Sequence, residues 1–359
     1  MDQLRKLCQQ RLIFKFGDKV RPLVSERLRQ ELEMIQTSGQ VGSFEKAIRA
    51  VEILSGQGVF WRLTGSGCSS LVSYLMDFSQ IDPTEHGLPY ERFLNANPGR
   101  NIQFRFDAHS KINRSEEDFD AILNEVSFDE VRIQKSTALA AIPSLLIEGI
   151  RQTDSDFDLT SIPWNDEATF EVLRSRNFEG IYQFEGIEFQ NLFPDLKPRS
   201  LTDIAAITSI QLCEVHEMGI FNEYIQRDFP QGDQQYEPCL VSETLQETRG
   251  MILFQEQIML IMNRVADIPL ADAYSFIKAV CKRQWEYVGR YRDWFVVQAV
   301  GNGVDEPDAF RLFEKIRDAA TRAVCKSHHL AEAVTTYQAA FLKAHFPSEF
   351  CRTLQMIQQ

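Results

Sequence analysis

The stretch from Gly87 to Asp107 reads GLPYERFLNANPGRNIQFRFD. Its last four residues alternate in character, because Phe104 and Phe106 are apolar whereas Arg105 and Asp107 are charged. Successive side chains of a strand point to opposite faces, so this alternation predicts a strand with one buried and one polar face. An arginine and an aspartate then stand two residues apart on the polar face.

Helical patterns flank this strand on both sides. Residues 1–57 are predicted to be helical, with Leu4, Leu7 and Leu12 on one face of the first helix. A serine cap predicts that the next helix starts at Ser25. Residues 59–61 suit a strand, TGSGCSS (64–70) a loop, and residues 101–135 short strands around an acidic helix at 115–124. Further helices are predicted at 43–54, 71–78, 144–150, 251–265, 270–280, 308–323 and 329–345.

Composition restricts the class of protein. The 359 residues are 44% hydrophobic and 25% charged, and no window is apolar enough to span a membrane. Seven cysteines without a CxxC pair argue against disulfide and zinc frameworks and favour a cytoplasmic protein. The net charge of −13 disfavours a broad nucleic-acid-binding surface, although residues 1–30 carry eight Lys/Arg against three Asp/Glu.

Several segments together resemble the catalytic core of the bacterial replicative DNA polymerase III α subunit, a C-family polymerase. They are SGQGVFWRLTGSGCSSLVSYL, IDPTEHGLPYERFLN, FEGIYQFEG, RGMILFQEQIMLIM and CKSHHLAEAVTTYQAAFLKAHFPSEF. The resemblance implies an α+β, mainly helical chain with a reduced nucleotidyltransferase-type palm and helical thumb- and fingers-like regions. The expected regions are 1–57 (helical), 58–150 (palm-like) and 151–359 (thumb/fingers-like). It also implies that the chain corresponds to only a piece of the family's architecture.

The family holds two metal ions with a D-x-D pair and a third aspartate, since Mg²⁺ needs hard oxygen ligands. By resemblance, these three positions are Arg105, Asp107 and Thr137. In an alternative alignment the pair falls on Gln103 and Arg105. Either way at most one carboxylate remains, with Asp107 as the single weak metal-ligand candidate. The resemblance therefore implies a degenerate catalytic site and no cofactor, with Mg²⁺ only if a residual polymerase site exists.

Other substrate-handling motifs of the family are altered in parallel. Its RPGP motif begins here at Leu212, and its lysine-rich triphosphate motif reads CKRQ from Cys281. Retained Gly-Ser and Lys-Ser-His motifs suggest residual phosphate contacts, or simply a turn and a helix cap. Aromatics at 285, 287, 291 and 294 alternate with arginines, which suits base stacking or ordinary helix packing. The nucleotide- or DNA-contact candidates are Gly65, Ser66, Lys278, Lys282, Arg283, Arg290, Arg292, Lys326 and His328.

Three functions compete at this point. The first is a non-catalytic polymerase relative that acts through a protein partner or self-association, in a regulatory, defence or mobile-element role. The second is a module that grips primer–template or single-stranded DNA without chemistry. The third is an active polymerase completed by another subunit, or one that uses other acids such as Asp118, Asp120 or Asp129.

Overall fold

The computed structural model describes residues 1–17, 20–94, 102–110, 114–150, 157–185, 197–212, 219, 223–224, 226–227 and 239–357. It divides into two compact units. Unit 1 comprises residues 1–204 and 330–359, and unit 2 comprises residues 205–329. The divisions fall inside two helices, α9 (Leu201–Leu212) and α16 (Lys326–His345).

Three helices open unit 1: α1 (Asp2–Phe16), α2 (Pro22–Thr37) and α3 (Val41–Gly56). Leu4 and Leu12 are buried on one side of α1, as the sequence predicts. The predicted start of α2 at Ser25 is wrong, because the helix begins at Pro22 and no side chain caps it. The fixed φ of proline suits the first helical position, where its missing N–H is no loss.

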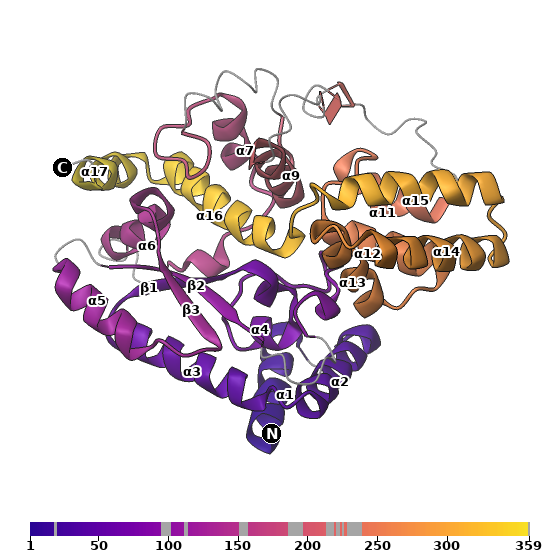
Figure 1. Cartoon of the computed structure of the whole chain (residues 1–359). Helices are drawn as coiled ribbons and strands as arrows, with labels where there is room; N and C mark the ends of the chain where they lie inside the picture. Colours follow the sequence, from indigo (N-terminus) through magenta and orange to yellow (C-terminus); the bar gives the residue numbers. More distant parts are fainter. Residues whose placement is uncertain are drawn as a thin grey trace. The chain divides into compact units, whose positions relative to one another are not determined.

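A three-stranded sheet follows, in the order β1 (Phe60–Thr64), β2 (Phe104–His109) and β3 (Val131–Lys135). β1 pairs with β2 antiparallel, and β2 pairs with β3 parallel. Figure 1 shows α3 running alongside this sheet, which it contacts at β1 and β3. β2 is therefore the central strand, and its polar face can meet residues from both neighbours.

The apolar face of β2 forms the core of unit 1. Phe104 and Phe106 are fully buried. The ring of Phe104 lies 5.0 Å from Phe44 of α3 and 5.1 Å from Phe93, and that of Phe106 lies 5.8 Å from Phe78. These edge-to-face contacts fix the strand against the helices and leave the alternate residues on the other face.

Shorter elements connect the sheet to the rest of unit 1. The predicted loop after β1 is a 3₁₀ helix, and the apolar helix α6 starts well before Pro143 rather than after it. Thr137 Oγ1 accepts a hydrogen bond from Ala140 N at 3.4 Å at the start of α6. The elements are η1 (Gly65–Ser69), α4 (Leu71–Leu75), η2 (Tyr90–Arg92), α5 (Glu116–Glu125), α6 (Ala138–Ile150), η3 (Leu159–Ser161), α7 (Glu167–Arg174) and α17 (Pro347–Ile357).

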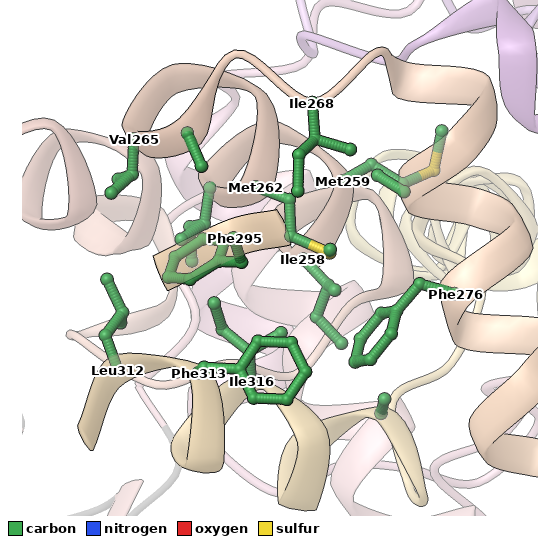
Figure 2. Packing of buried hydrophobic residues seen from close by; sticks show 14 of the residues in the cluster. Ile258, Met259, Met262, Val265, Ile268, Phe276, Phe295, Leu312, Phe313 and Ile316 are labelled. Atoms are coloured by element: carbon green, nitrogen blue, oxygen red, sulfur yellow. The ribbon is translucent and has the colours of Figure 1, made fainter. Parts of the chain in front are cut away.

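The regular elements in the described part of unit 2 are all helices. Phe276, Phe295 and Phe313 centre its core, with ring centroids 5.4 Å (Phe276–Phe313) and 5.8 Å (Phe295–Phe313) apart (Figure 2). Ile258 and Met262 add fully buried side chains from the helix that the QEQIM motif opens. The elements are α11 (Cys239–Leu245), η5 (Gln246–Thr248), α12 (Gln255–Ala266), α13 (Leu270–Cys281), α14 (Trp285–Gly301) and α15 (Glu306–Ala320).

The predicted fold class, α+β and mainly helical, is confirmed. The palm, thumb and fingers roles of regions 58–150 and 151–359 stay predictions. Within the described ranges, no helix is both long and apolar enough to cross a membrane.

Candidate functional site: the polar face of the sheet

The strand register assembles a polar face from all three strands. Arg62 of β1 lies opposite Asp107 of β2, which lies opposite Gln134 of β3. Two residues before Asp107 on the same strand, Arg105 of β2 lies opposite Arg132 of β3. Directly paired residues share a face of the sheet, so three arginines and one aspartate lie on the same side.

Asp107 is held by an arginine rather than standing open to solvent. Arg62 Nη2 lies 3.0 Å from Asp107 Oδ2 and 2.8 Å from Glu332 Oε1 of α16. Both partners are largely shielded, since the side chain of Asp107 is 18% exposed and that of Glu332 is 3% exposed. One guanidinium thus bridges two carboxylates.

Neighbouring residues fix this ion triad. Tyr182 places its ring 5.1 Å from the Arg62 guanidinium, and Thr335 accepts a hydrogen bond from the same group. Gln183 Nε2 donates to the second oxygen of Glu332 at 2.9 Å. Burial, followed by the negative charge of Glu332, raises the pKa of Tyr182, so its hydroxyl stays protonated.

The Arg62 side chain is charged despite its burial. Burial acts to lower its pKa, but the carboxylates of Glu332 and Asp107 and the hydroxyl of Tyr182 outweigh it, so the pKa is raised. Its Nε atom is buried and has no hydrogen-bond partner among the residues that the structure describes. The guanidinium is thus a permanent positive charge at the centre of the site.

The pair of Mg²⁺ ions that the resembled family holds does not fit these residues. Two metal ions need several carboxylate oxygens that converge on a shared centre. Asp107 instead faces Arg62, and the next residue on its face is Arg105. Across the described part of the chain, no group of three His, Cys, Asp or Glu side chains is arranged to hold a metal ion. The positive charges of Arg62 and Arg105 would also repel a Mg²⁺ ion.

The third predicted position, Thr137, has a structural role. It follows β3, is exposed to solvent, and its hydroxyl oxygen accepts the Ala140 N–H in the first turn of α6. Helix capping is a frequent use of threonine. The structure thus brings Arg105 and Asp107 together on β2 and places Thr137 at the end of the neighbouring strand.

The retained Gly65-Ser66 pair forms the start of η1 directly after β1. Gly65 has a φ of +76°, a conformation that glycine adopts without strain. Contact of this turn with phosphate stays a prediction.

The retained Lys326-Ser327-His328 motif opens α16 inside unit 2. Lys326 is 4% exposed, and its Nζ lies 2.7 Å from both carboxylate oxygens of Glu247. Glu256 of the QEQIM motif accepts hydrogen bonds from Lys326 N at 2.7 Å and Ser327 N at 3.2 Å. The two motifs thus form one buried junction in which Glu256 caps α16.

The five remaining contact candidates lie on or next to α13 and α14. Lys278 stacks over the Tyr274 ring at 4.2 Å, and Arg290 pairs with Glu286 at 2.6 Å. Arg292 bonds Asp293 at 2.8 Å, whereas Lys282 and Arg283 are exposed between the two helices. DNA contact by these residues stays a prediction. Of the altered RPGP motif, residues 213–215 lie outside the described residues.

Sequence reasoning missed Arg62 and Glu332, which form the ion triad with Asp107. Arg62 carries a signal, because a charged residue interrupts the strand-forming run 59–63 and a buried charge requires a partner. Glu332 is the one acid in the sequence of α16, where two alanines flank it, which is a similar signal. Their pairing lies beyond sequence reasoning, since 270 positions separate them.

Comparison with known proteins identifies the class and then the family. The family model described as "Bacterial DNA polymerase III alpha NTPase domain" matches residues 2–107. The family model described as "Bacterial DNA polymerase III alpha subunit finger domain" matches residues 138–303. Both are parts of a DNA-synthesising enzyme. The chain belongs to the family of bacterial DNA polymerase III α subunits.

Individual relatives agree with these matches. DNA polymerase III subunit alpha of Deinococcus radiodurans is 33% identical over 227 residues, which cover 58% of the chain and 16% of the relative. The same subunit of Thermus aquaticus is 33% identical over 214 residues, which cover 57% of the chain and 17% of the relative. The subunit of Haemophilus influenzae is 28% identical over 231 residues, which cover 63% of the chain and 20% of the relative. The chain spans a fifth or less of the length of these relatives.

Proposed function

We propose that this chain is a catalytically silent member of the DNA polymerase III α family that acts by binding, in a regulatory, defence or mobile-element role. The observation that carries the proposal is the Arg62 bridge between Asp107 and Glu332. It fixes a positive charge at the one carboxylate that the family alignment leaves on β2. Polymerase chemistry needs metal ions at this place to neutralise the triphosphate and activate the attacking oxygen.

The palm-like role of region 58–150 belongs to the same proposal. The sheet keeps its apolar face, with Phe104 and Phe106 fully buried. Its polar face carries Arg105, where the resemblance implies an aspartate, and the neighbouring Arg132. A scaffold that keeps its packing and loses its metal ligands suits binding better than catalysis. Cytoplasmic location, predicted from the cysteines, is part of this proposal.

Primer extension tests the proposal directly. The purified chain is incubated with a primed template, all four deoxynucleotides and either Mg²⁺ or Mn²⁺, with an active polymerase as the positive control. We expect no extension above background. Extension that disappears in Asp107→Asn would overturn the proposal and support the third hypothesis, an active polymerase. Repeating the assay with cell extract added tests whether another subunit supplies the missing groups.

A second candidate function, gripping single-stranded DNA, has its own support on α14. Trp285 is 57% exposed and Tyr287 is 55% exposed, and Arg290 lies over the Tyr287 ring at 5.4 Å. Exposed aromatic rings next to arginine are the chemistry that stacks bases. By contrast, Tyr291 packs against the core residue Phe276 at 5.6 Å, so only part of the aromatic stripe is available.

Fluorescence anisotropy with a short oligothymidylate tests this candidate. Each stacked base contributes about 1–3 kcal/mol, so Trp285→Ala/Tyr287→Ala should weaken binding at least fivefold, by about 1 kcal/mol. Phe310→Ala is a matched control, since Phe310 is an aromatic residue with 44% exposure that lies on α15 and not on α14. Equal affinities for the three proteins would eliminate α14 as a stacking surface.

A protein partner or self-association remains part of the proposal. α14 also exposes Val297, at 67%, on the same side as Tyr287 and Trp294. A grouped apolar surface of this kind is typical of association sites. Light scattering that gives a clean monomer of 41.4 kDa, with no partner recovered from extract, would contradict it.

A further inference from the structure

Two arginines stand side by side on the polar face of the sheet. Arg105 of β2 and Arg132 of β3 are direct partners in the parallel register, and both are exposed to solvent. Within the described residues neither side chain has a hydrogen bond or an ion pair. Neighbouring strands lie about 4.8 Å apart, so the two side chains leave the sheet at nearly the same point.

This pairing differs from the arrangement of four other arginines of unit 1. Arg11, Arg27, Arg29 and Arg62 each pair with a carboxylate. On β3 itself, Lys135 pairs with Asp120 of α5 at 2.7 Å. The neighbouring cations of the sheet, Arg62 and Lys135, are thus neutralised by acids.

The unpaired arrangement is unfavourable for the fold taken alone. Like charges directly opposite each other across a ladder destabilise a sheet. Asp107, the nearest acid on the same face, already shares a guanidinium with Glu332. The local carboxylates are thus committed to Arg62, and the charge of the Arg105–Arg132 pair stays available for an anion from outside.

We propose that Arg105 and Arg132 form a metal-independent binding site for phosphate groups. Two guanidinium forks present planar pairs of N–H donors, which match phosphate oxygens in a bidentate manner. A metal-based site on such a face would need divalent ions between carboxylates and phosphate. Here the positive charge is built into the strands, so the phosphate binds with no ion between. This inference rests on the proposed loss of metal chemistry.

The phosphodiester of a nucleic-acid strand and the triphosphate of a free nucleotide share this chemistry. Titration of the full chain with a fluorescent oligothymidylate, and separately with dATP, distinguishes these two sources. Both titrations are run in EDTA and repeated with Mg²⁺. Binding of either probe in EDTA supports the site, and the tighter probe identifies the source.

The key variant is Arg105→Ala/Arg132→Ala. We expect it to weaken binding about tenfold or more at about 50 mM salt. For the oligonucleotide, the slope of log affinity against log salt should become shallower by about 1.4, because each lost contact to a single strand removes about 0.7. Arg105→Lys/Arg132→Lys keeps the charges but loses the bidentate geometry. Its affinity should therefore lie between that of wild type and that of Arg105→Ala/Arg132→Ala.

Two control measurements distinguish phosphate binding at this arginine pair from general charge attraction and from loss of folding. Arg311→Ala, which removes an exposed arginine of unit 2 paired with Asp308, should change affinity less than twofold. The unfolding midpoint of Arg105→Ala/Arg132→Ala should not fall, since like-charge repulsion has been removed.

Four results would each overturn the proposal. They are wild-type affinity in Arg105→Ala/Arg132→Ala, absence of any binding in wild type, binding that EDTA abolishes, and equal binding of polyglutamate. The last of these would indicate a site for acidic protein instead of phosphate.

The two proposals fail separately. Primer extension by wild type would overturn the catalytically silent function, whereas unchanged phosphate affinity in Arg105→Ala/Arg132→Ala would overturn only this site.

Discussion

At the scale of single residues, the central feature is a guanidinium placed between two acids. Arg62 lies in the otherwise uncharged strand β1. Its side chain is 21% exposed, and this partial burial is tolerated because Asp107 and Glu332 both face it. The same side chain stabilises the site and sets a positive charge against its two carboxylates. In the proposed function, stability and loss of chemistry share this one physical origin.

Removal of this guanidinium should destabilise unit 1 strongly. Arg62→Ala leaves two carboxylates close together with no cation, and breaking a buried ion pair in this way costs about 3–5 kcal/mol. Urea unfolding measures the loss. The isosteric change Glu332→Gln should cost less, because Asp107 then still has its partner. A loss below about 0.5 kcal/mol for Arg62→Ala would show that the triad is merely a surface pair.

A second residue-scale prediction concerns pH. Burial, followed by the nearby His328, lowers the pKa of His329 from 6.5 to about 3, and its Nδ1 has no partner within the described residues. The unfolded chain therefore binds a proton that the folded chain does not bind between these two values. Stability is full above pH 6.5 and falls as the pH decreases through this window.

The expected size follows from the same linkage. Between pH 7 and pH 5, wild type should lose about 2 kcal/mol more unfolding free energy than His329→Gln. Urea unfolding at several pH values measures the difference. Above pH 7 the two proteins should show parallel pH dependences, which serves as an internal control. Parallel curves throughout the range would contradict the burial of a neutral imidazole.

At the scale of elements, two sequence motifs far apart in the chain make a single junction. Glu256 of α12 is 1% exposed and caps the start of α16 through Lys326 N and Ser327 N. Gln257 secures the start of α12, because its Oε1 accepts from Leu253 N at 2.9 Å and Phe254 N at 3.0 Å. The family motifs at these positions thus have a structural use that does not depend on catalysis.

Loss of the cap should loosen the first turn of α16. Glu256→Ala leaves two buried N–H groups without an acceptor, which costs about 2 kcal/mol. Hydrogen exchange at residues 326–329 should accelerate in the same variant. Glu314→Ala, which removes one side of a half-buried ion pair with Arg317, serves as the control and should cost less than about 1 kcal/mol. Unchanged exchange at 326–329 would contradict the capping role.

Local patterns predicted most elements, and long-range contacts account for what was missed. Phe104 and Phe106 alternate with charged residues, so the strand and its two faces follow from the sequence alone. The predicted starts at Ser25 and Ser144 were too late, because Pro22 opens α2 and because α6 begins before Pro143 and continues through it. Helix packing outweighs the hydrogen bond that an internal proline removes.

The candidate site was predictable only in part. Arg105 and Asp107 were located by the family signature before them, and their shared face follows from strand periodicity. The bridge from Arg62 to Glu332 was not predictable, because it depends on how a C-terminal helix packs against an N-terminal strand. The pairing of Arg132 with Arg105 was not predictable either, since the register of β3 against β2 is a property of the folded sheet.

At the scale of the whole molecule, each unit has a core of its own. Phe106 is fully buried in unit 1, and Phe295 is fully buried in unit 2. Separate cores imply that each unit resists unfolding through its own contacts.

Core truncations should therefore act locally. Phe295→Ala and Phe106→Ala should each cost about 3–5 kcal/mol within their own unit. Hydrogen exchange read by mass spectrometry should show faster exchange in α12–α15 for Phe295→Ala and in the sheet for Phe106→Ala. Equal acceleration in both units by either change would mean that the two cores unfold as one.

The order of the chain has a further consequence for how the protein is made. In the sequence, the whole of unit 2 interrupts unit 1. Arg62 is contacted by Glu332 and Thr335 of α16, and Thr335 follows Arg62 by 273 positions. At a synthesis rate of about 5–20 residues per second, β1 emerges from the ribosome roughly 14–55 s before its partner helix. During most of that interval Arg62 has Asp107 as a partner but still lacks Glu332 and Thr335. A nascent chain stalled before residue 330 should therefore be the form that most needs a chaperone.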